Sequence, residues 1–232
     1  MKNITEFIKE GFKLGKNYKK PYNYRPKTRD ELKDIIKKLI AKRGNEADLN
    51  DIDTSEITDM SKLFYNSNFS GDISGWDVSN VKDMSDMFHD SEFNGDISKW
   101  DVSSVTNMNN MFRGNKLIDK NMDISKWDIG NVTDMRNMFT NSNFDGDLSK
   151  WDVSNVTDMR FLFSDSSFTG ENGDISYWNV SRVKDMSYMF LASKFTGKNG
   201  DLSKWNVNKK TKKKEMFLAT PLEGKEPAWY RK

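Results

Sequence analysis

The stretch that decides the fold is W-D-V-S-N-V-K-D-M-S-D-M-F-H-D-S-E-F-N-G-D-I-S-K, residues 76–99, because the chain repeats it. The seven tryptophans stand at positions 76, 100, 127, 151, 178, 205 and 229, so their spacing is always 24 or 27 residues. The three extra residues of the longer units fall in one turn, within 118–123, 169–174 and 196–201. Such a period is typical of solenoids, in which each unit buries its apolar face against its neighbours.

The apolar spacing within one unit predicts its secondary structure. Trp76 and Val78 alternate with polar residues, which predicts a short strand over 75–79 with both side chains facing inward. Met84, Met87 and Phe88 have the i, i+3, i+4 spacing of one helical face, which predicts about two turns of helix. The aspartate before each such segment suits a helix N-cap. We therefore predict an α/β solenoid of about seven coils, each 24–27 residues long.

The repeat W-x-V-S-x-V-x-x-M-x-x-M-F, followed by F-N-G-D-I-S, resembles the BspA-like leucine-rich repeat family of bacteria over residues 52–220. The resemblance implies a right-handed, leucine-rich-repeat-like array that presents a surface to a protein partner, commonly within a cell-surface protein or adhesin.

Both ends of the array are predicted to be caps. Thr28 and Glu31 have capping-box spacing, Gly44 is a helix stop, and five apolar residues between them share one face. A weaker amphipathic helix is expected over residues 3–14. At the other end, Lys210 and Lys213 stand where other units have Val and Met, so stacking should stop there. The predicted domains are an N-terminal helical cap (1–50), the solenoid (51–220) and a C-terminal cap segment (221–232).

Composition argues against an enzyme. The chain has no cysteine and one histidine, His89, so thiolate metal sites, cysteine nucleophiles and most histidine chemistry are excluded. We predict no catalytic residues, no metal site and no cofactor. The Gly-Asp pairs, such as Gly95-Asp96, are better explained by turn hydrogen bonds than by calcium. No apolar leader or membrane span is visible, so we expect no membrane contact and a cytoplasmic location, in a bacterium or in a host cell if a phage encodes the chain. A cell-surface location would require a missing leader.

The net charge of +2 conceals an uneven distribution. Residues 1–50 hold 14 Lys and Arg against 7 Asp and Glu, residues 51–207 hold 15 against 25, and residues 208–232 hold 8 against 3. Two candidate surfaces follow. The first is a concave face formed by the outward strand positions Lys99, Asp101, Lys126, Asp128, Lys150, Asp152, Tyr177, Asn179 and Lys204, together with Arg182. The second is a basic end patch formed by Lys209, Lys210, Lys212, Lys213 and Lys214.

Each surface has a plain alternative explanation. On the concave face, the lysine and aspartate columns are either a lattice of charges that neutralise each other or a docking surface for a partner. Tyr177 and Arg182 break the pattern of these columns. The end patch either binds nucleic acid through its phosphates or only solubilises a cap. The acidic middle argues against nucleic acid running along the array.

Three functions remain open. The first is a non-enzymatic scaffold that presents a rigid solenoid surface to a protein partner. The second is a phage- or prophage-encoded inhibitor of a host defence nuclease, anti-CRISPR-like, with a Cas ribonucleoprotein as its partner. The third is a bacterial surface adhesin that lacks its leader.

Overall fold

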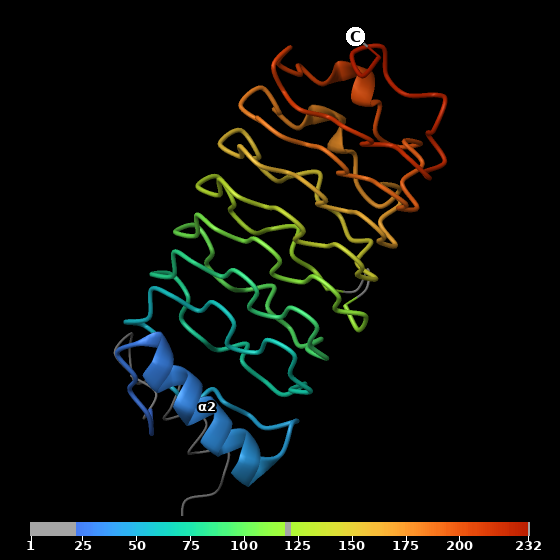
Figure 1. Cartoon of the computed structure of the whole chain (residues 1–232). Helices are drawn as coiled ribbons and strands as arrows, with labels where there is room; N and C mark the ends of the chain where they lie inside the picture. Colours follow the sequence, from blue (N-terminus) through green and yellow to red (C-terminus); the bar gives the residue numbers. More distant parts are fainter. Residues whose placement is uncertain (1–21, 119–121, 232) are drawn as a thin grey trace, which may run out of the picture.

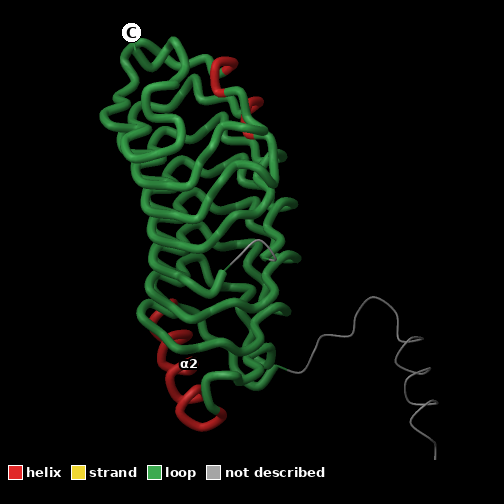
Figure 2. Tube along the Cα trace, turned by 90° about the vertical axis from the view of Figure 1, so that its right-hand side faces the viewer, coloured by secondary structure: helices red, strands yellow, loops and turns green. Residues whose placement is uncertain are grey.

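The chain winds into a stack of similar coils, and the computed structural model describes residues 22–118 and 122–231. Helix α2 (Arg29–Arg43) lies at one end of the stack and the C-terminus at the other (Figure 1). A view turned by 90° shows the same regular stacking along one axis (Figure 2). Parallel bridges join one position of each coil to the same position of the next, at Asp59, Asp83, Asn107, Asp134, Asp158, Asp185 and Lys212. The structural unit is therefore the 24- or 27-residue sequence repeat, and we call the whole arrangement the coil stack.

The core of the coil stack is made of columns of identical side chains. One phenylalanine from each coil stacks on the next, with ring centroids 5.6 to 5.8 Å apart from Phe64 to Phe217. The Val and Met columns beside it are buried as well. Each coil therefore buries its apolar side chains against the coils above and below it, which gives a long, thin core.

The tryptophan column also carries a hydrogen bond from each coil to the preceding one. The indole Nε1 of every tryptophan donates to a backbone carbonyl of the previous coil, over 2.7 to 3.3 Å. The acceptor is an Ile or Leu carbonyl, as in the bond from Trp127 to Ile97. A buried indole N–H needs such a partner. This bond explains why tryptophan, and not another large apolar residue, holds this place in the repeat.

The helix predicted over each D-M-x-x-M-F segment is wrong. Asp86 and Asp90 have φ angles of 55° and 50°, in the left-handed region that interrupts a right-handed helix. The N–H groups of Met84, Asp86, Phe88 and Asp90 donate to carbonyls of the next coil, while those of Met87 and His89 donate back three residues. The segment is a run of turns that shares its hydrogen bonds with its neighbour. A helix would keep those bonds within one coil and leave the stack without them.

The strand predicted at the tryptophan is also wrong, although its inward side chains are confirmed. Trp76 and Val78 are buried, as the alternation predicts. In the described residues, however, no backbone hydrogen bond joins the segment 76–79 to its equivalents in the following coils. The bridges lie at Asp83 and its counterparts instead. The ladder that links the coils therefore runs along the methionine side of the repeat.

Helix α2 begins and ends where its sequence signals predict. The hydroxyl of Thr28 accepts a hydrogen bond from the backbone N–H of Glu31 at 3.2 Å, and Gly44 follows the last helical residue with φ 86°. Leu32, Ile36 and Leu39 are its buried residues, and they join the core of the coil stack. The weaker helix predicted over 3–14 lies outside the described residues. Two short 3-10 helices, η1 (Ile175–Tyr177) and η2 (Leu202–Lys204), precede the tryptophans of the later coils.

Candidate docking surfaces

The residues of the predicted concave face are all exposed, in columns along the coil stack. Among the described residues no ion pair joins the lysine column to the aspartate column, so both the self-neutralising lattice and the docking surface stay predictions. Asp101 instead accepts from the backbone N–H and the hydroxyl of Ser103, at 3.1 and 2.6 Å. These bonds, with the hydroxyl first, lower the pKa of Asp101. The aspartates of this face hold turns, and its lysines make no ion pair with them. Lys99 and Lys126 lie near Asp96 and Asp123, whose pKa values are lowered first by serine hydrogen bonds and further by these lysines.

The C-terminal end of this face differs from the rest, as its sequence predicts. Tyr177 is 76% exposed, and the Nζ of Lys204 lies 5.0 Å from the centroid of its ring. The guanidinium of Arg182 donates to Asn155 Oδ1 over 2.7 Å. Asn155 in turn donates to the carbonyl of Gly130, and equivalent asparagines make the same bond in earlier coils. Arg182 therefore stands at the position that asparagine holds in these earlier coils, and it places a cation at the end of the asparagine ladder.

The basic end patch forms on the last coil. Lys209, Lys210, Lys212 and Lys214 are exposed, and Lys213 is half-buried. Thr211 is buried beside Lys210, and its hydroxyl donates to the carbonyl of Val183 at 2.7 Å. Thr211 is thus buried where other coils bury valine, while Lys210 is exposed. Stacking does not stop at Lys210 and Lys213 as predicted, because Phe217 stacks on Phe190 and Trp229 stacks on Trp205.

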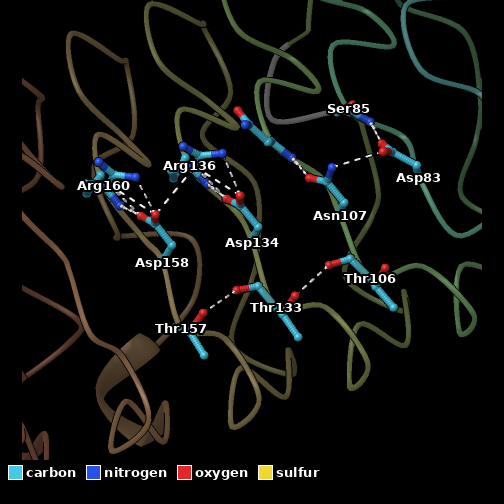
Figure 3. A network of polar contacts seen from close by, with 11 residues as sticks. Asp83, Ser85, Thr106, Asn107, Thr133, Asp134, Arg136, Thr157, Asp158 and Arg160 are labelled. Carbon is cyan, nitrogen blue, oxygen red and sulfur yellow. Dashed lines mark hydrogen bonds and ion pairs between the residues drawn. The ribbon is translucent and has the colours of Figure 1, made fainter.

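A polar network ties the coils together along the ladder side (Figure 3). Arg136 binds Asp134 of its own coil at 2.8 Å and lies 3.5 Å from Asp158 of the next coil. Arg160 binds Asp158 at 2.7 Å, and this hydrogen bond is the main cause of the raised pKa of Arg160. In a second line, threonine hydroxyls donate to backbone carbonyls of the preceding coil, from Thr133 to Thr106 and from Thr157 to Thr133. These side chains are occupied by structural contacts, so they are weak candidates for a binding role.

A surface that sequence reasoning missed lies on the same side, nearer the C-terminus. Phe161 and Tyr188 stack with ring centroids 4.6 Å apart and an interplanar angle of 10°, and both are only half-buried. Their φ angles are 55° and 61°. Two aromatic residues here thus adopt a conformation that costs L-residues about 1–2 kcal/mol each.

Two leucines extend this surface. Leu191 and Leu218 stand three residues after Tyr188 and its counterpart in the next coil, and Leu218 is 41% exposed. Side chains at this spacing touch in another coil, where His89 Nδ1 lies 2.8 Å from Asp86 Oδ1. We call Phe161, Tyr188, Leu191 and Leu218 the aromatic face. Its signal was present in the sequence, because earlier coils hold Lys62, Asp86, Asn110 and Asn137 where Phe161 and Tyr188 stand.

The described part of the chain offers no cluster of three or more His, Asp or Glu side chains that could hold a metal ion. His89 lies between two carboxylates, 2.8 Å from Asp86 and 3.4 Å from Asp90. None of the helices in residues 22–118 and 122–231 is long and apolar enough to cross a membrane.

Comparison with known proteins gives a family but no activity. Residues 33–123 and 113–229 match the family described as "Mycoplasma protein of unknown function, DUF285". This is the BspA-like repeat family in its general sense, so the predicted resemblance holds at that level; the specific repeat motif stays a prediction. Neither a curated protein nor a solved structure matches the chain.

Proposed function

The chain belongs to the DUF285 family, and from its surface we propose that it is a non-enzymatic scaffold that presents a rigid face to a protein partner. In this proposal the coil stack is a right-handed, leucine-rich-repeat-like solenoid. The coil stack suits this function because its surface backbone is ordered before binding. Backbone, indole and side-chain hydrogen bonds hold each coil to the next, so the backbone that carries the exposed side chains is already ordered before a partner arrives. Less conformational entropy is then lost on binding.

The aromatic face is the observation that carries the proposal. Half-exposed aromatic side chains are common at the energetic centres of protein interfaces. Phe161 and Tyr188 also sit at a backbone position that favours Asn and Asp, so their presence works against local stability. Residues that cost stability and remain accessible point to a role in binding. The Nζ of Lys214 lies 5.7 Å from the centroid of the Tyr188 ring and places a cation beside the aromatic face.

The double variant Phe161→Asn, Tyr188→Asn tests the proposal. Asparagine is the residue that other coils use at this position, so we expect the variant to fold with unchanged or slightly greater stability. The chain, immobilised, should capture a stoichiometric protein from native-cell extract. Titration calorimetry with that purified protein should show at least a tenfold loss of affinity for the double variant.

A matched control uses the same column outside the aromatic face. Asp86→Asn combined with Asn137→Asp changes two left-handed positions outside the aromatic face and leaves Phe161 and Tyr188 in place, so it should bind like the wild type. Failure to capture any stoichiometric protein in several growth states would contradict the scaffold function. Equal binding by the double variant would instead move the site away from the aromatic face, and the variant Tyr177→Ala, Arg182→Gln would then test the predicted concave face.

The identity of the captured protein separates the narrower functions. A guided-nuclease ribonucleoprotein would support the anti-CRISPR-like inhibitor, and loss of target cleavage on adding the chain would complete that assignment. A host-surface protein would support the adhesin.

A further inference from the structure

The tryptophan column and the phenylalanine column end differently at the last coil. The final phenylalanine, Phe217, is covered by Tyr230, which packs edge-on with centroids 5.1 Å apart and an interplanar angle of 81°. The final tryptophan, Trp229, stacks on Trp205 at 6.1 Å and 17°. Tyr230 packs edge-on against Trp229 as well, with centroids 6.3 Å apart, and the Trp229 side chain is half-buried. Its remaining surface lines an open cavity of about 430 Å³ with Lys209 and Lys213.

A second cavity adjoins the first. It has a volume of about 410 Å³, and its cationic lining residues are Arg182, Lys184 and Lys210. Asn208 lines both cavities, so the two adjoin at this residue of the last coil, and together they are treated as one surface. We call this surface the end groove.

The cations of the end groove are not neutralised by carboxylates. None of the ion pairs within the described residues includes the five cations, which are Arg182, Lys184, Lys209, Lys210 and Lys213. The Asn155 amide oxygen holds one nitrogen of the Arg182 guanidinium at 2.7 Å, which fixes its direction and leaves its other donors available. In contrast, Arg136 and Arg160 nearby on the ladder side are occupied by Asp134 and Asp158. The end groove is therefore where unpaired positive charge gathers.

We propose that the end groove binds single-stranded nucleic acid. Phosphates would lie against Arg182, Lys184 and Lys210, and a base would stack on the indole of Trp229 between Lys209 and Lys213. Proteins that bind single-stranded nucleic acid without sequence preference combine cations along the phosphate backbone with aromatic side chains on which the bases stack. An acidic protein segment would satisfy the lysines, but a single-stranded nucleic acid carries a stackable base beside every phosphate and so matches both parts of the end groove. This site goes beyond the scaffold function, because it shares no residue with the aromatic face and takes a different class of ligand.

The charge distribution limits the site to a few nucleotides. Residues 51–207 carry 25 acidic against 15 basic residues, so the rest of the coil stack repels phosphate. A strand would therefore cross the end of the stack and not follow its length.

The test is fluorescence anisotropy of the whole chain with a labelled single-stranded 10-mer, as DNA and as RNA. Saturable binding at low salt should weaken as salt rises, with a slope of about −2 on logarithmic axes if about three phosphates are neutralised. The triple variant Arg182→Gln, Lys184→Gln, Lys210→Gln should bind at least tenfold more weakly. Its matched control, Lys99→Gln, Lys126→Gln, Lys150→Gln, removes the same charge from the predicted concave face and should bind like the wild type.

Stacking has its own readout. Oligonucleotide binding should quench tryptophan fluorescence in the wild type, and Trp229→Phe should remove most of that change while circular dichroism stays the same. Equal loss of affinity in both triple variants would overturn the proposal, as would the absence of binding at low salt. Equal affinity for poly-glutamate would also overturn it and assign the end groove to an acidic protein.

Discussion

At the scale of single residues, each tryptophan has two structural roles, because its ring fills the core and its N–H satisfies a carbonyl of the preceding coil. The Trp127 Nε1 donates to the Ile97 carbonyl at 3.1 Å, and the Trp127 ring is only 3% exposed. Leaving such an acceptor unpaired in the interior costs about 1–3 kcal/mol, whereas lost ring volume adds a separate cavity cost.

The variant Trp127→Phe should therefore lower the free energy of unfolding by at least about 2 kcal/mol, measured by urea denaturation. The control Met135→Leu, an apolar exchange of similar volume in the same coil, should cost less than about 1.5 kcal/mol. If the two variants were equally stable, the indole hydrogen bond would contribute nothing beyond packing.

Single positions also mark the limit of what the sequence predicts about the candidate sites. Tyr177 and Arg182 are visible because they break columns of lysine and asparagine, and the structure places both on the exposed surface. Phe161 and Tyr188 are not found by the same reasoning, since a predicted helix gives no reason to examine one of its solvent positions. Only the left-handed backbone there makes an aromatic residue unusual.

At the scale of elements, helix α2 is fastened to the coil stack at its C-terminal end. Arg43 forms two hydrogen bonds with the Asp51 carboxylate, at 2.9 and 2.8 Å, and a third with the Asp48 carbonyl. The Arg43 hydrogen bond is the main cause that lowers the pKa of Asp51 to about 2. The charged form of Asp51 is therefore the one that stabilises the docked helix.

This pKa predicts how the attachment depends on pH. A carboxylate with a lowered pKa contributes stability that is fully present above its unfolded value, near pH 4, and is lost as the pH falls toward about 2. We expect Asp51→Asn to lower the free energy of unfolding by about 1–2 kcal/mol at pH 7 and by much less at pH 2. Asp34→Asn, which alters an exposed carboxylate on the same helix, is the control. A deficit of equal size at both pH values would rule out the ion pair as its cause.

The two helix predictions differ in outcome for a physical reason. Helix α2 has an N-cap, a C-terminal glycine and apolar residues on one face, so its local signals agree with each other. The D-M-x-x-M-F segments have the apolar spacing alone. Their backbone N–H groups are needed by the neighbouring coil, as the bond from Asp86 to Asn109 illustrates, and that demand is invisible in a single repeat.

At the scale of the whole molecule, stability should be a sum over neighbouring coils, because each coil contacts only the next. The seven tryptophans and their spacing are enough to predict the unit and its register. They do not predict which side of the unit carries the ladder, because only the tryptophan segment alternates as a strand does, whereas the methionine segment has helical spacing. Hydrogen bonds between coils decide that side.

Adding a coil tests this description directly. A second copy of residues 127–150, inserted after Lys150, supplies a complete 24-residue unit with its own Trp, Val, Met and Phe. The longer chain should fold, and its urea m-value should rise by about a tenth, in proportion to the surface that it buries. The denaturation midpoint should not fall. A molten product or a lowered midpoint would mean that the coils are not interchangeable.

The methionine columns give the molecule a chemical property as well as a core. Eleven of the 13 methionines have side chains with no exposed surface, from Met60 to Met216, and the chain contains no cysteine. Thioether oxidation needs access to the sulfur, and the sulfoxide is too polar for a packed core. The intact coil stack thus keeps this sulfur from oxidants, and sulfoxide at a given methionine records that its coil has opened. A protein with no redox-active thiol therefore carries, spread evenly along its length, a chemical record of its own local unfolding.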